Sequence, residues 1–347
     1  MINDANQELI SWDNSTNMQA EVINISSWMQ YMEVKEVALD IFKSNFLTLK
    51  NEAVNTAVER ANEFTEKLII GLQNKKMETE WIRDPWFQYS LFEAQKSYAK
   101  SWDSDMEAVL IDVLVDRLNY TERNLKQIVL DESIPIIAKL TSAQLDTLTI
   151  LFLLKYTQNY KVNNPELLKW YLNTNLIPFV DNLSKEHSLY QHLEFTWCWS
   201  ISLWSKTIED VFLDNYKCIF FKWFSKEYYL EQTWEPIDKY EGFVVQCFNN
   251  SVKYQFSARN NDLLETQITD SGNSNECRNL YNEFVFTKDE VKNKLIEVWW
   301  EVISKLFDVW DNSALKNMTI TTVWIAIAQA NFRRKTWTTL DLSIWIK

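Results

Sequence analysis

The residues with the clearest potential for chemistry are Cys198 and His192, which lie six positions apart. A thiol beside an imidazole can form a nucleophile and its general base. The other histidine, His187, lies five residues before His192, which is not the i, i+4 spacing of two zinc ligands on one helix face. The sequence shows no third group that would orient the imidazole. We therefore keep His192 and Cys198 as weak candidates, with a structural turn or packing as the favoured roles.

Acidic residues give no stronger candidate. Asp112 and Asp116, like Asp210 and Asp214, are four residues apart and could share Mg²⁺ on a helix face. No D-D-x-x-D run accompanies them, and solvated helix faces are often acidic. Neither a phosphate-binding G-x-x-x-x-G-K-[ST] loop nor a G-x-S-x-G elbow is present. We predict no catalytic residue, no metal site and no cofactor, and the sequence favours a non-enzymatic role.

The cysteines and the apolar runs help to predict the cellular compartment of the protein. The four cysteines (Cys198, Cys218, Cys247 and Cys277) include no C-x-x-C pair, which fits buried thiols in a reducing cytosol. The N-terminus lacks the basic and apolar regions of a signal peptide. The longest apolar run, residues 148–154, is too short to cross a bilayer. We expect a cytoplasmic protein without membrane association.

The net charge of −13 bears on the partners. An acidic chain repels phosphate backbones, so the charge disfavours nucleic acid as a partner. The one dense basic run, Arg333 to Lys335, falls where a helix is expected to end, and cations there stabilise the last carbonyl groups. A protein partner, or a second copy of the chain, fits the charge better.

The segments that position the candidate residues are mostly predicted to be helical. Apolar residues recur at steps of three and four in the stretches 34–46, 54–68, 106–118, 145–154 and 208–212. Thr121 can cap a helix that Pro135 interrupts, Thr141 or Ser142 can cap another, and Asn164-Pro165 is a strong start signal. Thr287 and Glu290 form a capping box.

Two segments have strand character. Residues 243–248 and 252–256 flank Asn249-Asn250-Ser251 and predict a hairpin. Residues 340–346 alternate apolar with polar side chains and predict a half-buried C-terminal strand. The fold class is therefore α+β and predominantly α-helical. We expect a polar N-terminal segment (1–31), two helical regions (32–140 and 141–235, the second compatible with a winged helix) and an α/β C-terminal part (236–347).

Glycine and tryptophan occur in abnormal numbers. The chain of 347 residues has 3 glycines and 17 tryptophans, whereas average usage of ~7% would give roughly 24 glycines. Trp12, Trp102, Trp310 and Trp337 adjoin turn-forming polar residues, where glycine is usual. We hypothesise that a gene in which UGA encodes glycine has been translated with UGA as tryptophan. The alternative is a chain that is truly rich in tryptophan. Trp345 has the context of a core residue and Trp310 is ambiguous.

If some of the tryptophans are read as glycine, several stretches resemble a family of uncharacterised bacterial proteins. The resemblance rests on residues 33–46 (EVKEVALDIFKSNF), 156–159 (YTQN), 178–183 (PFVDNL), 190–196 (YQHLEFT) and 340–346 (LDLSIWI). It runs from about residue 10 to the C-terminus and implies no activity. The sequence departs from the family pattern where tryptophan replaces glycine.

The N-terminal stretch 11–20 (SWDNSTNMQA) resembles short Gly-Asp-Asn…Gln motifs of bacterial signalling and phage-defence proteins, if residue 12 is glycine. Some such motifs act by self-templating β stacking, and amide ladders with apolar side chains suit cross-β pairing. The alternative is a polar tail, or one strand added to the protein's own sheet. The candidate self-association residues are Asn14, Asn17, Met18, Gln19, Val22, Ile23 and Ile25.

These observations favour an interaction or regulatory protein of a bacterial cytoplasm, associated with defence, that oligomerises through its N-terminal segment. One alternative is a regulator that binds nucleic acid through the winged-helix-like region. The other is an enzyme of unidentified class built around Cys198 and His192.

Overall fold

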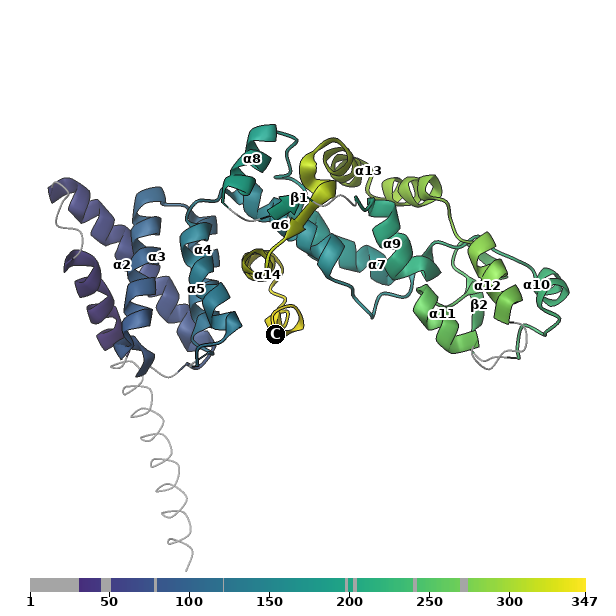
Figure 1. Ribbon diagram of the computed structural model, residues 1–347, viewed down its shortest axis with the longest axis horizontal. Coiled ribbons are helices and arrows are strands. Elements are labelled where there is room, and N and C mark those ends of the chain that lie inside the picture. Colours follow the sequence, from purple (N-terminus) through teal and green to yellow (C-terminus); the bar gives the residue numbers. More distant parts are fainter. Residues whose placement is uncertain are drawn as a thin grey trace, which may run out of the picture. The chain divides into compact units, whose positions relative to one another are not determined.

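The computed structural model describes residues 31–44, 51–77, 80–120, 122–196, 199–201, 205–239, 242–268 and 274–347. It divides into two compact units, Met1–Leu140 with Ile346–Lys347, and Thr141–Trp345. Helices dominate both units, and the strands are few and short (Figure 1). The prediction of a predominantly α-helical α+β fold with a small hairpin is confirmed. Among the described residues, no helix is both long and apolar enough to cross a bilayer.

The described part of the first unit consists of helices that pack through their apolar faces. They are a helix over residues 31–44, α2 (Asn51–Asn74), the 3₁₀ turn η1 (Glu80–Arg83), α3 (Pro85–Ser101), α4 (Ser104–Arg117) and α5 (Leu125–Ile137). Phe42, Phe64, Leu68 and Phe87 are fully buried there. Asp84 caps α3 through the amide of Trp86, with Pro85 at the first helical position.

Two details of this unit differ from the expectation. The cap of α5 is Asn124, whose side chain accepts a hydrogen bond from the amide of Gln127, and not Thr121. Pro135 lies inside α5 and does not interrupt it. It falls in the last turn, where the loss of one hydrogen bond affects few residues after it.

The second unit is larger and contains every strand among the described residues. Its first half comprises α6 (Ser142–Tyr156), α7 (Pro165–Tyr171), η2 (Leu172–Leu176), η3 (Ile177–Phe179), α8 (His187–Phe195), β1 (Trp199–Ile201), α9 (Ile208–Tyr216) and η4 (Lys217–Ile219). Its second half comprises α10 (Lys226–Thr233), β2 (Val244–Cys247), β3 (Asn250–Phe256), α11 (Asn261–Ile268), α12 (Ser274–Glu283), α13 (Lys288–Asn312), η5 (Ala314–Asn317), β4 (Met318–Ile320), α14 (Thr322–Thr336) and η6 (Leu342–Ile344).

The predicted hairpin exists as the antiparallel pair β2–β3, in which Val244 lies opposite Phe256. The second strand pair, β1–β4, joins segments more than a hundred residues apart, with Trp199 opposite Ile320. Helix α6 is buried over most of its length and packs against α14. The α6–α14 pair therefore forms the centre of the second unit.

The predicted C-terminal strand is wrong. The predicted strand would contain Leu340, Leu342, Ile344 and Ile346. Instead, Leu342–Ile344 form a single 3₁₀ turn, which the Asp341 side chain caps. In a strand, Leu342 and Ile344 would share a face, but Leu342 is buried and Ile344 is 62% exposed. The indole N–H of Trp345 donates to the Tyr156 carbonyl at 2.8 Å, and its ring meets Phe152 edge to face.

Three helices end at a tryptophan in the left-handed conformation. The φ angles are 50° at Trp102 after α3, 58° at Trp234 after α10 and 57° at Trp337 after α14. Each tryptophan N–H donates to the carbonyl four residues earlier, at 2.8 Å. Among the described non-glycine residues, only Lys76 shares a positive φ with them. This is the helix ending that glycine normally supplies.

Two further tryptophans fit their surroundings poorly. Trp299 has non-helical angles (φ −134°, ψ 43°) at a kink inside α13. Trp324 is fully buried in α14, and its indole N–H has no hydrogen-bond partner. The indole N–H of Trp299 donates to Asn173 Oδ1 at 2.7 Å. Trp310 differs from Trp324, because it is buried and its N–H donates to the Lys206 carbonyl at 2.9 Å. The ambiguous Trp310 therefore has the environment of a core tryptophan.

Trp337 gives a direct measure of the backbone constraint, because its side chain is 90% exposed and contributes little packing. We expect Trp337→Gly to be about 1 kcal/mol more stable than Trp337→Ala, since alanine keeps the Cβ atom that the left-handed conformation disfavours. Urea denaturation measures the difference. Equal stability of the two variants would show that the helix end is not constrained in this way.

Candidate functional site

The structure describes only some of the candidate residues that the sequence predicts. His192 is exposed on α8, and its Nδ1 lies 2.8 Å from the Nε2 of Gln144. The same Gln144 nitrogen donates to the Leu189 carbonyl at 3.1 Å. Cys198 lies outside the described residues, as do the N-terminal candidates Asn14, Asn17, Met18, Gln19, Val22, Ile23 and Ile25. His192 is thus described as a partner of Gln144.

The other cysteines are buried. Cys218, Cys247 and Cys277 are buried within the second unit. Burial raises the pKa of the Cys218 thiol to about 12, and it also raises the pKa of Cys247. Because the thiolate is the reactive form, these two thiols are inert near neutral pH.

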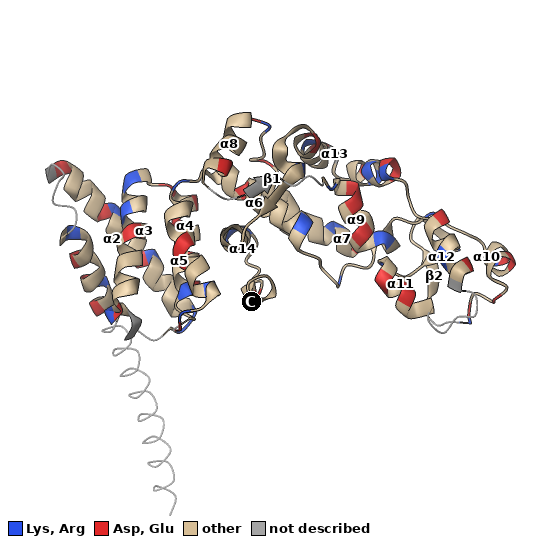
Figure 2. Cartoon of the chain, viewed as in Figure 1, with Lys and Arg blue, Asp and Glu red and all other residues tan. Residues whose placement is uncertain are grey.

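Three of the four aspartates in the two sequence pairs form ion pairs with lysines. Asp116 pairs with Lys75 at 2.6 Å, Asp210 with Lys288 at 2.7 Å, and Asp214 with Lys206 at 2.8 Å. Figure 2 shows acidic and basic residues interspersed along the helices. Within the described ranges, no group of three or more histidine, cysteine or carboxylate side chains could hold a metal ion.

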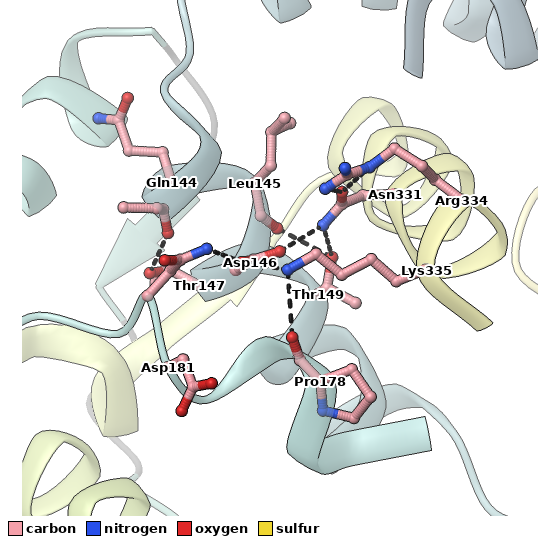
Figure 3. A network of polar contacts seen from close by, with 12 residues as sticks. Gln144, Leu145, Asp146, Thr147, Thr149, Pro178, Asp181, Asn331, Arg334 and Lys335 are labelled. Carbon is pink, nitrogen blue, oxygen red and sulfur yellow. Dashed lines mark hydrogen bonds and ion pairs between the residues drawn. The ribbon is translucent and has the colours of Figure 1, made fainter. Parts of the chain in front are cut away.

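A buried polar cluster surrounds Asp146 in α6, whose side chain has no solvent exposure (Figure 3). Its Oδ2 accepts hydrogen bonds from Lys335 Nζ and from Asn182 Nδ2, both at 2.7 Å. Its Oδ1 accepts a bond from Asn331 Nδ2 at 3.0 Å. The buried carboxylate is therefore paired with a cation and hydrogen-bonded through both oxygens, as a buried charge requires.

This network joins three segments that are distant in sequence. Asn331 also donates to Thr149 at 2.8 Å, which ties α14 to α6 at a second point. Lys335 Nζ reaches the Pro178 carbonyl of η3 at 3.1 Å, so one ammonium group contacts both α6 and η3. Arg334 bonds to the Asn331 oxygen at 2.9 Å. The basic run at residues 333–335 is thus partly used inside the unit.

Sequence reasoning missed this cluster. Asp146 was visible as the one charged residue in the run Leu145–Leu154, which is otherwise apolar or carries threonine. A carboxylate at such a position needs a buried cation, but the sequence does not show which distant lysine supplies it. The lone carboxylate in this run could have identified Asp146, but nothing in the sequence identifies Lys335 as its partner.

A second polar group, Lys155 at the end of α6, is partly buried. Its Nζ donates to the carbonyls of Lys316 at 2.7 Å and Met318 at 2.9 Å. It also lies 5.5 Å from the centroid of the Trp310 ring. Burial lowers the pKa of Lys155 to about 8. The ammonium is aimed at backbone carbonyls, so it fastens the end of α6 to the segment that leads into β4.

An open groove of about 520 Å³ lies beside the network. It is lined by the end of α6, the loop that follows, α7, η2 and the chain after α14, including Leu153, Tyr160, Leu167, Asn175 and Leu340. The segment η2 is a π-helical turn, a conformation that recurs at functional sites. However, Asn175 donates to the Tyr171 carbonyl and Gln158 to the Asn215 carbonyl. The lining amides serve the protein itself, and they indicate no ligand class.

The Asp146–Lys335 pair can be compared with an exposed pair in the same unit. Lys335→Met should lower the free energy of unfolding by about 3 kcal/mol, because it leaves a buried carboxylate without its cation. Lys185 pairs with Asp308 at 2.7 Å, and both side chains are about half exposed. Lys185→Met should therefore cost below about 1 kcal/mol. Similar losses in urea denaturation would contradict a special role for the buried pair.

Comparison with known proteins yields one relationship. A family model matches residues 29–346, and the family is uncharacterised. No curated protein and no solved structure matches the chain. The matched region begins after the N-terminal self-association candidates.

Proposed function

We propose that this chain, which belongs to the uncharacterised family whose model matches residues 29–346, is an interaction or regulatory protein of a bacterial cytoplasm. Its N-terminal segment mediates self-association. The observation that carries the proposal is the mixture of amide and apolar side chains within residues 14–25, which suits cross-β stacking. The resemblance of residues 11–20 to signalling and phage-defence motifs supports a role in defence signalling.

The position of the segment supports the same proposal. Residues 14–25 precede the region that the family model matches, as expected of a signalling module joined to a separate body. The acidic net charge of −13 favours a protein partner or a second copy over nucleic acid.

The nucleic-acid alternative draws on the consecutive helices α6, α7 and α8, which are compatible with a helix-turn-helix. Two observations weigh against it. Strand β1 pairs with the distant β4 and not with a neighbouring wing strand. Basic side chains of the second unit are largely paired, as Lys206, Lys222 and Lys288 illustrate. The enzyme alternative depends on Cys198, which lies outside the described residues.

We also propose that Trp102, Trp234 and Trp337 occupy positions that the family fills with glycine, because UGA is read as glycine in the source organism. Their left-handed backbone and their exposed fractions of 62%, 81% and 90% support this proposal. The kink at Trp299 and the unpartnered indole of Trp324 are independent support.

Self-association is tested with the full-length chain. We expect sedimentation velocity to show assembly that grows with concentration, accompanied by thioflavin T binding. Substitution of both Ile23→Asp and Ile25→Asp should raise the concentration needed for assembly at least tenfold, because charge repels within an apolar stack.

The control adds the same charge beside the motif, through Ser26→Asp with Ser27→Asp, and should assemble like the wild type. A wild-type chain that stays monomeric at every concentration would overturn the proposal. Equal assembly of all three proteins would do the same.

A further inference from the structure

An apolar groove lies where the described chain begins. It has a volume of about 250 Å³ between the helix over residues 31–44 and α2, and it is lined by Tyr31, Met32, Lys35, Glu66, Ile69, Ile70 and Gln73. Met32 is 49% exposed and Ile70 is 55% exposed. Large aliphatic side chains are thus open to water on both walls. Covering these side chains with an apolar segment would remove apolar surface from water, which favours docking.

The two walls are held in place by polar contacts. Lys35 Nζ pairs with Glu66 Oε1 at 2.9 Å, from one helix to the other. The hydroxyl of Tyr31 donates to the Met77 carbonyl at 3.2 Å, which fixes the first described residue near the end of α2. The groove is therefore formed in advance and requires little ordering before it receives an apolar segment.

The chain itself carries a suitable segment at its entrance. Val22, Ile23 and Ile25 precede Tyr31 by six to nine residues. At ~3.3 Å per residue, six residues span roughly 20 Å, so Ile25 can reach Ile70. A short tether gives an effective concentration in the mM range, whereas a second copy is present only at its bulk concentration. The same chain is consequently the favoured occupant.

We propose that residues 22–25 bind in the groove of their own chain in the monomer. Docking covers Ile23 and Ile25, the apolar side chains that self-association uses. The groove therefore competes with assembly and sets the concentration at which assembly begins. This inference rests on the proposed function for its consequence, but the docking can be measured without any assembly.

Docking is tested by cross-linking in dilute full-length protein. The native cysteines all lie at residue 198 or beyond, and the three described ones are buried, so introduced cysteines can be identified by peptide mass. Ile25→Cys with Ile70→Cys should form an intrachain disulfide in most molecules on mild oxidation. The matched control pairs Ile25→Cys with Leu125→Cys on α5, where Leu125 is 49% exposed, and should form at least tenfold less. Equal yields for the two pairs would overturn the inference.

The competition is tested by opening the groove. Ile70→Glu should lower the concentration at which assembly begins at least tenfold, whereas Leu125→Glu should leave it unchanged. If the cross-link forms but Ile70→Glu leaves the concentration for assembly unchanged, docking does not compete with assembly and that part of the inference is overturned. If no variant assembles, the proposed function fails, and the cross-link still decides whether docking occurs.

Discussion

The left-handed backbone conformation is unfavourable for any residue with a Cβ atom. Three helices of this chain nevertheless end at a residue in that conformation. After α3, the left-handed Trp102 lets the chain turn at once into the Asp103 cap of α4. After α14, the left-handed Trp337 directs the chain towards Trp345, whose indole bonds to the Tyr156 carbonyl of α6. The path of the chain out of these helices depends on a conformation that costs about 1–2 kcal/mol for a side chain and almost nothing for glycine.

The end of α14 links this backbone constraint to the buried charge. The N–H of Trp337 bonds to the Arg333 carbonyl and so closes the helical turn that contains Lys335. The ammonium of Lys335 is the cation of the buried Asp146 and also contacts η3. The backbone at residue 337 therefore helps to position the one cation that the centre of the second unit requires.

Local chemistry made much of the fold predictable. Thr287 and Glu290 form the expected capping box, Asn164 and Pro165 begin α7, and the hairpin forms around residues 247–250. These features depend on residues close together in sequence. The C-terminal segment was mispredicted because its alternation is also compatible with a single 3₁₀ turn that buries Leu342. The partner of Asp146 lies 189 residues away, so no local pattern identifies it.

A peptide mass map of the protein from its native source would identify the residues at the three left-handed helix ends. The informative peptides are those that contain positions 102, 234 and 337. We expect the mass of glycine at all three positions. The mass of tryptophan there would contradict this expectation, and the strained helix ends would then be a genuine property of the chain.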